Sequence, residues 1–317
     1  MSAALALSAA RHRAHALHGE ARAWPETNCY VDLWIEVLHA LGHDPHAMLG
    51  CALTCDFEDD QWLFFKPATS DLYALYGVDV QELTIWRSAL DHVCTQVERG
   101  NLPLIEVDAY HLPDTRGVSY GQKHAKTTIA IAAIDRAEKR LGYFHNAGYY
   151  ALAGSDFDGV FAASVLPPYT EYVRLRGARV LDGRSLASRA RVLLGAHLAR
   201  APRENPFARY RKCFARDLAE LSQAPSERFH EYAFATVRQF GAAFELSASY
   251  LGWLAEHGDI AAEAARAPAA EIASLAKTLQ FKAARAVMRR RDAECDALFD
   301  GLEAAWEGVY QPLRLAH

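Results

Sequence analysis

The chain has 317 residues, of which 51% are hydrophobic and 23% are charged, a composition typical of a globular protein. Its formal net charge of −5 argues against general nucleic-acid binding, because proteins that bind phosphate backbones usually carry a basic excess. The 6 cysteines are few and irregularly spaced, which argues against a disulfide framework and favours a reducing cytoplasm.

The N-terminal stretch at residues 3–10 is rich in alanine and has no basic residue before it, whereas histidines and arginines follow it. A secretory signal has the opposite order. No apolar run approaches the roughly 20 residues that span a bilayer. We therefore expect a cytoplasmic protein that binds no membrane.

Helix and strand patterns are mixed in the first half of the chain. Apolar residues at helical spacing predict a helix over residues 30–41, which Gly42 ends, and a second helix over residues 83–97, which Gly100 ends. Short apolar segments predict strands, and a polar turn at residues 135–140 predicts a hairpin. The predicted strands cover residues 62–65, 102–107, 127–134 and 141–144.

The second half of the chain is predicted to be helical. Asn205 before a proline predicts a capped helix start, and Gly258 before an aspartate predicts the end of one helix and the start of the next. We therefore expect an α+β fold, with a mixed domain over residues 1–165 and an all-α domain over residues 166–317. The predicted helices cover residues 205–221, 227–256, 270–290 and 292–310.

A cysteine, a histidine and an asparagine follow one another in the chain order of a papain-like nucleophilic site. Cys29 lies where the first predicted helix begins, and the N–H groups at a helix start favour a thiolate. The predicted hairpin brings Asn146 back alongside His124, where its side chain would fix the tautomer of a general base. The alternative orienting residue is Asp135, and His145 is the histidine most easily confused with His124.

Further residues are candidates for binding. The backbone N–H of Cys29 would face an oxyanion, with the side chain of Asn28 or Thr27 as a second donor. Asp108 and Tyr110 follow a strand that leads toward the histidine, and they are candidates for binding an acceptor amine. The alternative is that Asp108 caps a turn and Tyr110 packs.

The first half contains three motifs, Asn28-Cys29, Gly100-x-x-Pro103-Leu-Ile-Glu-Val-Asp108-x-Tyr110-x-Leu112-Pro113 and His124-Ala125. With these motifs it resembles the butirosin-biosynthesis acyltransferase family, over roughly residues 28–146. The resemblance implies a papain-like cysteine peptidase fold, with Cys29 as nucleophile, His124 as general base and Asn146 as orienter, where the relatives tend to have aspartate. Residues 238–241 resemble an uncharacterised bacterial family associated with amino-acid:carrier-protein ligases.

The resemblance implies acyl or aminoacyl transfer in specialised biosynthesis. The acyl group would pass from the phosphopantetheine thioester of a carrier protein to Cys29, and then to an amine or hydroxyl of a small acceptor. No bound cofactor is implied. Basic residues between 282 and 291 are a candidate surface for an acidic carrier protein, and the helical half is a candidate homodimer interface.

Three alternatives stay open. A peptidase or amidase would use the same site residues, and a papain-like shell would bind a carrier protein without catalysis. A metal enzyme is the third, because Glu36-x-x-His39 and Glu227-x-x-His230 have the spacing found in di-iron bundles. Such pairs are common by chance, and Cys51-x-x-x-Cys55 has no companion pair, so no metal site is predicted.

Overall fold

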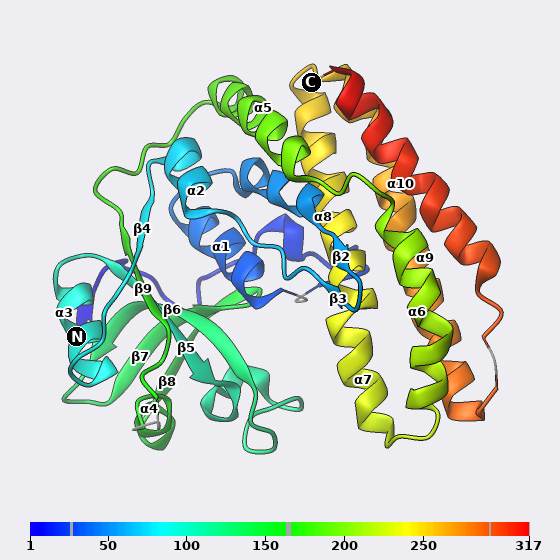
Figure 1. Cartoon of the computed structure of the whole chain (residues 1–317). Coiled ribbons are helices and arrows are strands. Elements are labelled where there is room, and N and C mark those ends of the chain that lie inside the picture. Colours follow the sequence, from blue (N-terminus) through cyan, green and yellow to red (C-terminus); the bar gives the residue numbers. More distant parts are fainter. Residues whose placement is uncertain (26–27, 163–165, 292, 317) are drawn as a thin grey trace. The chain divides into compact units, whose positions relative to one another are not determined.

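The computed structural model describes residues 1–25, 28–162, 166–291 and 293–316 (Figure 1). Over these ranges the protein is α+β, with an antiparallel sheet and a helical C-terminal region. The chain divides into two compact units. The first unit consists of Met1–Gly19, Cys29–Pro45 and Ala68–Leu181, and the second of Glu20–Asn28, His46–Pro67 and Asp182–His317.

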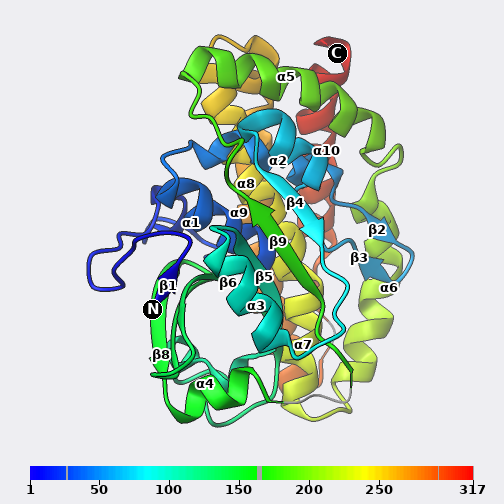
Figure 2. The ribbon, with the colours of Figure 1, turned by 90° about the vertical axis from the view of Figure 1, so that its left-hand side faces the viewer.

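A seven-stranded antiparallel sheet forms the frame of the first unit (Figure 2). Its order is β4-β9-β5-β6-β7-β8, and β1 also pairs with β6. The predicted strands at residues 102–107, 127–134 and 141–144 are confirmed as β5, β6 and β7. The strands are β1 (Ser2–Ala3), β4 (Asp79–Glu82), β5 (Leu102–Asp108), β6 (Lys126–Asp135), β7 (Arg140–His145), β8 (Gly148–Ala153) and β9 (Thr170–Arg174).

Two helices of the first unit pack on these strands. α1 (Cys29–Ala40) contacts β6, β7 and β8, and α3 (Ala89–Glu98) contacts β5 and β6. Residues of β5 and β6 at alternate positions, Ile105 and Ile129 among them, share a buried core with Val93 of α3. The same unit contains the shorter helices α2 (Thr69–Tyr76) and α4 (Ser155–Val160).

The boundaries of the predicted elements depend on their caps. α1 confirms the helix predicted over residues 30–41, and it ends before Gly42, which is left-handed with φ +77°. The start predicted for the second helix was wrong. α3 begins at Ala89 because the Ser88 side chain accepts a hydrogen bond from the Asp91 N–H. The strand predicted over residues 62–65 is reduced to β3 (Gln61–Trp62), which pairs with β2 (Phe57–Glu58).

The second unit is mostly helical, and its predicted helix starts at Asn205 and Asp259 are confirmed as side-chain caps. The single helix predicted over residues 227–256 is two helices, because Thr236 leaves the helical conformation with φ −120° and ψ −88°. The helices are α5 (Gly183–Arg200), α6 (Pro206–Leu221), α7 (Ser226–Ala235), α8 (Val237–Glu256), α9 (Ile260–Arg289) and α10 (Asp296–Ala316). No helix within the described residues has the length and apolarity needed to cross a membrane.

Segments from the early part of the chain complete the core of the second unit. The Trp24 indole N–H donates to the Ala273 carbonyl at 2.9 Å, and the Tyr310 hydroxyl donates to the Leu53 carbonyl at 2.6 Å. The ring of Trp62 lies with its centroid 4.7 Å from that of Phe240. The helices therefore bury aromatic side chains that belong to the first 67 residues of the chain.

Candidate active site

Cys29 is the first residue of α1 and is partly buried. Burial raises the pKa of its thiol and is the largest effect on it, while hydrogen bonds from the Thr127 side chain and the Thr128 backbone offset part of the increase. Both threonines lie at the start of β6. Because its pKa is raised, this thiol needs a base before it can act as a nucleophile.

The Thr127 hydroxyl connects Cys29 to a buried histidine. Thr127 Oγ1 lies 2.8 Å from His145 Nε2, and His145 Nδ1 lies 2.5 Å from Asp114 Oδ2. A carboxylate only accepts hydrogen bonds, so we assign the Nδ1 proton toward Asp114. Nε2 then accepts from the Thr127 hydroxyl, and the same Thr127 side chain is hydrogen-bonded to Cys29. Hydrogen bonds therefore connect the thiol, the Thr127 hydroxyl, the imidazole and the carboxylate in a continuous chain.

Asp114 is held on both of its oxygens. The Tyr143 hydroxyl donates to Oδ1, while His145 donates to Oδ2. Tyr143 and His145 are two residues apart on β7 and therefore point to the same face of the sheet. Burial, and then the charge of Asp114, raise the pKa of Tyr143, which keeps its proton in place. The side chains of His145 and Asp114 are only 2% and 4% exposed.

His124 lies in a second, exposed arrangement. Its Nδ1 is 2.5 Å from Asp108 Oδ2, and its ring stacks on that of Tyr110 with centroids 4.6 Å apart. Burial alone would raise the pKa of Asp108. Hydrogen bonds from His124 and from the Tyr110 and Ala125 N–H groups outweigh burial, so the pKa lies below its ordinary value. The His124 side chain is 75% exposed, so this pair is open to solvent.

The expected pairing of Asn146 with His124 is corrected by this geometry. Asn146 and Ala147 form the turn between β7 and β8, where Asn146 has φ +45°. Phe144 lies opposite Ala130, so the end of β7 reaches the beginning of β6 but not His124, which precedes the strand. Among the described residues no hydrogen bond joins Asn146 to His124. Asp108, expected to bind an acceptor, holds the histidine instead.

The other expected site residues have partners of their own. The Asn28 side-chain amide, expected to face an oxyanion, donates to the Phe65 carbonyl at 2.6 Å. Thr27 lies outside the described residues. Asp135, the alternative orienter, is at the far end of β6 and accepts from the Glu138 N–H.

The sequence patterns do not predict Thr127, His145 and Asp114 as a group. Their contact depends on the register of β6 against β7, which a β-bulge shifts between Ile131 and Ala133. The signals in the sequence were the alternation of Tyr143 and His145 along one strand, and an aspartate next to Pro113. Neither signal fixes the partner across the sheet.

No metal site is formed by the described residues: none of their groups of three or more His, Cys, Asp or Glu side chains could hold a metal ion. In the Glu36-x-x-His39 pair, the Glu36 carboxylate binds the side chains of His12 and His18 and the His15 N–H.

Two family models together cover most of the chain. Residues 13–175 match the DUF1839 N-terminal domain, and residues 183–315 match the DUF1839 C-terminal domain. No curated protein matches the chain. The N-terminal match contains Cys29, both histidine arrangements and their carboxylates. The chain belongs to the DUF1839 family.

Proposed function

We propose that this protein is a cysteine-dependent acyltransferase with a papain-like N-terminal fold. It would take an acyl or aminoacyl group from a carrier-protein thioester onto Cys29 and pass it to an amine or hydroxyl of a small acceptor. The observation that carries the proposal is the hydrogen-bond chain from Cys29 through Thr127 to His145 and Asp114. A nucleophilic thiol, a base and a carboxylate behind the base are the groups that acyl transfer requires.

In the first half-reaction, Thr127 accepts the thiol proton while its own hydroxyl proton moves to Nε2 of His145. Asp114 stabilises the resulting imidazolium. The Cys29 thiolate attacks the thioester carbonyl, and the bond from that carbonyl to the phosphopantetheine sulfur breaks. The departing thiolate takes the proton back from His145 through Thr127, which leaves acyl-Cys29 and a neutral imidazole.

In the second half-reaction, the acceptor amine or hydroxyl attacks the carbonyl of acyl-Cys29. The acceptor gives one proton to His145 through Thr127, and Cys29 departs as a thiolate that receives this proton. The exposed pair of His124 and Asp108 is a second candidate base for the acceptor. A peptidase or amidase would form the same kind of acyl-Cys29 intermediate and transfer the acyl group to water. A non-catalytic module would bind the carrier protein without acylation of Cys29.

Intact-mass spectrometry with a panel of acyl and aminoacyl pantetheine thioesters tests the proposal. We expect an acyl adduct on the wild type and none on Cys29→Ala. Cys94→Ala, which removes a partly buried cysteine of α3, is the matched control and should acylate normally. An adduct that persists in Cys29→Ala, or no adduct together with a thiol that resists iodoacetamide, contradicts the proposal. Added amines then separate transfer from hydrolysis.

The relay is tested by the rate of acylation. His145→Gln should slow acylation by about 100-fold or more, since general-base catalysis contributes roughly that much. Thr127→Val should also slow it, and Thr127→Ser, which restores the hydroxyl, should recover most of the rate. If His124→Gln slows acylation and Thr127→Val does not, the base is His124. Circular dichroism of each variant controls for misfolding.

A further inference from the structure

Amine and hydroxyl acceptors differ in the number of protons that they must lose. A hydroxyl loses one proton when it attacks acyl-Cys29, and the relay through Thr127 and His145 accounts for that proton. An amine enters from water at neutral pH as an ammonium ion, because the ordinary pKa of an amine lies above neutral pH. It must lose one proton before it can attack and a second when the amide forms. Transfer to an amine therefore needs a second proton acceptor.

His145 cannot be this second acceptor. Its Nε2 lies 2.8 Å from the Thr127 hydroxyl and its Nδ1 lies 2.5 Å from Asp114 Oδ2, so both ring nitrogens are occupied. Its side chain is 2% exposed, which closes the direct path for a proton to bulk water. The one proton that His145 takes up returns to Cys29 at the end of each transfer. The extra proton must therefore leave through another group, one that reaches solvent.

His124 has the geometry of such a group. Its Nδ1 lies 2.5 Å from Asp108 Oδ2, and we assign the Nδ1 proton toward this carboxylate, so Nε2 carries the free lone pair. Among the described residues, none forms a hydrogen bond with Nε2 of His124, whose side chain is 75% exposed. An imidazole with one nitrogen on a carboxylate and the other in water can take a proton from a substrate and pass it to solvent.

Neighbouring residues hold both members of this pair. Asp108 Oδ1 accepts from the Tyr110 N–H at 3.0 Å and from the Ala125 N–H at 3.1 Å, while Oδ2 contacts His124. The Tyr110 ring stacks on the imidazole with an interplanar angle of 11°. The pair therefore keeps its orientation although it is exposed to solvent.

The pair lies on the strands that carry the candidate active site. His124 precedes Thr127 by three residues, a separation of at most about 10 Å along an extended chain. Asp108 ends β5 and lies opposite Lys126 of β6. Lys126 donates to Glu106, the other carboxylate of β5, at 2.9 Å. These two charges neutralise each other, which leaves the imidazole of His124 as the base beside the candidate active site.

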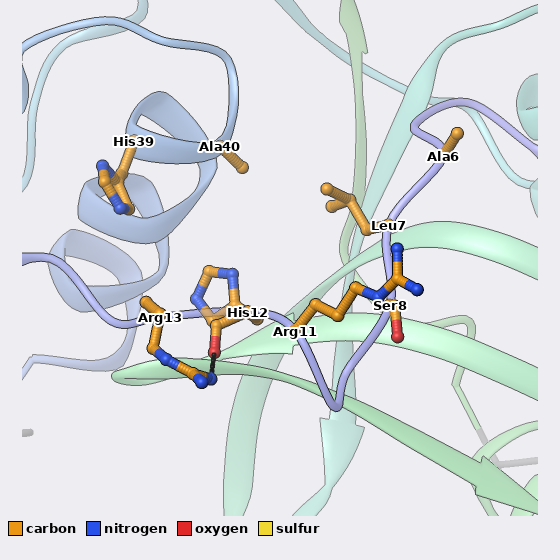
Figure 3. Close-up of a pocket in the computed structure, with 8 residues that line it drawn as sticks. All are labelled: Ala6, Leu7, Ser8, Arg11, His12, Arg13, His39 and Ala40. Atoms are coloured by element: carbon orange, nitrogen blue, oxygen red, sulfur yellow. Dashed lines mark hydrogen bonds between the residues drawn. The ribbon is translucent and has the colours of Figure 1, made fainter.

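A cavity of about 580 Å³ lies at the far end of α1 from Cys29 (Figure 3). His39 and Ala40 line it, about 16 Å from the start of that helix at 1.5 Å per residue. Its lining includes Arg11 and Arg13 and no acidic residue, so it does not attract an ammonium ion. This cavity is therefore not a site for an acceptor amine.

We propose that the acceptor is an amine and that His124 takes the first of its two protons. This inference rests on the proposed function, because it concerns the second half-reaction of the same enzyme. The ammonium ion gives a proton to Nε2 of His124, and Asp108 stabilises the imidazolium. The free amine attacks the carbonyl of acyl-Cys29, and the bond from that carbonyl to the sulfur breaks. The second proton passes through Thr127 and His145 to the departing thiolate. The imidazolium of His124 releases its proton to water, so each transfer yields an amide, a thiol and one proton in solution.

Transfer from preformed acyl-Cys29 tests this inference. The full chain is acylated to completion with a pantetheine thioester from the panel above, freed of donor and mixed with methylamine or methoxyamine. Intact-mass spectrometry then follows the loss of the adduct. At neutral pH methylamine is an ammonium ion, whereas methoxyamine is already a free amine. His124→Gln should slow transfer to methylamine by about 100-fold or more, the typical contribution of a general base, and keep transfer to methoxyamine within about threefold of the wild type.

Two further variants complete the test. Asp108→Asn, which keeps the size of the side chain, should slow transfer to methylamine with the same selectivity, because it removes the charge that stabilises the imidazolium. His230→Gln, which changes an exposed histidine of α7, is the matched control and should equal the wild type with both amines.

Equal transfer to methylamine by the wild type and His124→Gln would overturn the inference and leave the proposed function standing. An equal slowing with both amines would also overturn it, because a lost proton acceptor affects only the ammonium ion. A wild type that forms no acyl-Cys29 contradicts the proposed function itself, and this inference with it.

Discussion

Glu36 is a buried carboxylate on which the N-terminal segment converges. It binds Nε2 of His12 at 2.7 Å, the His15 N–H at 2.9 Å and Nδ1 of His18 at 2.6 Å. His18 also lies 3.4 Å from Oδ1 of Asp32. A buried carboxylate destabilises a fold unless its oxygens are paired. These hydrogen bonds to the Glu36 carboxylate therefore hold the N-terminal segment on α1.

The stability of the protein should fall at alkaline pH because of His18. Burial lowers the pKa of His18, but hydrogen bonds and charge from Asp32 and Glu36 outweigh it and raise the pKa from 6.5 to about 9. The stabilisation is therefore complete below the unfolded value of 6.5 and disappears as pH rises through about 9. Urea unfolding at pH 6, 7.5 and 10 should show this loss in the wild type.

His18→Gln should flatten this pH dependence, because it removes the titrating group. His230→Gln, which changes an exposed histidine of α7, should keep the dependence of the wild type. An identical slope in the wild type and His18→Gln would assign the alkaline loss to other groups.

At the scale of single elements, two glycines end helices in the same backbone conformation but in different surroundings. Gly77 follows α2 with φ +70°, and a Cβ there would lie 2.2 Å from the Gly177 carbonyl oxygen. Gly100 follows α3 with φ +76°, and a Cβ there would meet no atom within 4 Å. The pair separates the cost of a left-handed backbone from the cost of a steric clash.

Gly100→Ala should destabilise the protein by about 1 kcal/mol, the cost of a left-handed alanine. Gly77→Ala should cost about 3 kcal/mol or more, because the backbone at Gly177 must also move. Urea unfolding at neutral pH measures both. Equal costs would show that the backbone around Gly77 relaxes without strain.

The elements that the sequence predicted well carry their own local signals. The helix starts at Asn205 and Asp259 are marked by capping side chains, and β5, β6 and β7 by apolar, β-branched runs. β4 and β9 were missed because they are short and pair with each other across a long separation, with Asp79 opposite Arg174. The break at Thr236 also has no local signal, since aromatic residues at helical spacing continue through it.

In the candidate site, too, local sequence patterns predict the positions of some residues but not their partners. The place of Cys29 at a helix start follows from the amphipathic pattern after it, and the place of His124 before β6 follows from the apolar run after it. The partners of these residues depend on strand register, which was not predictable. The hydrogen bonds of His124 to Asp108 and of Thr127 to His145 both cross between strands or their ends.

At the scale of the whole molecule, each unit is assembled from separate stretches of the chain. The second family model begins at residue 183, yet the second unit also contains residues 20–28 and 46–67. Within that unit Gly241 comes so close to Trp24 that a Cβ would lie 2.5 Å from the indole. The helices are therefore shaped around side chains that a C-terminal fragment would lack.

Residues 182–317 expressed alone should show no cooperative thermal transition, because the sites of Trp24 and Leu53 would be empty. Circular dichroism in the near and far ultraviolet during heating measures this. The full chain with Trp24→Ala is the control and should fold with a loss of about 3–5 kcal/mol, as for other buried tryptophans. A fragment that melts as sharply as the full chain would contradict the prediction.

The hydrogen bond from Trp24 to Ala273 joins residues that are 249 positions apart in the chain, so it can form only long after Trp24 has been synthesised. At about 5–20 residues per second, a ribosome needs roughly 12–50 s to add Ala273 after Trp24 has been made. For that time the indole has no native neighbour on α9, while the strands of the first unit are already being completed. Nascent chains should therefore recruit holding chaperones to residues 20–28 and 46–67, and slower translation of the last helices should lengthen that association.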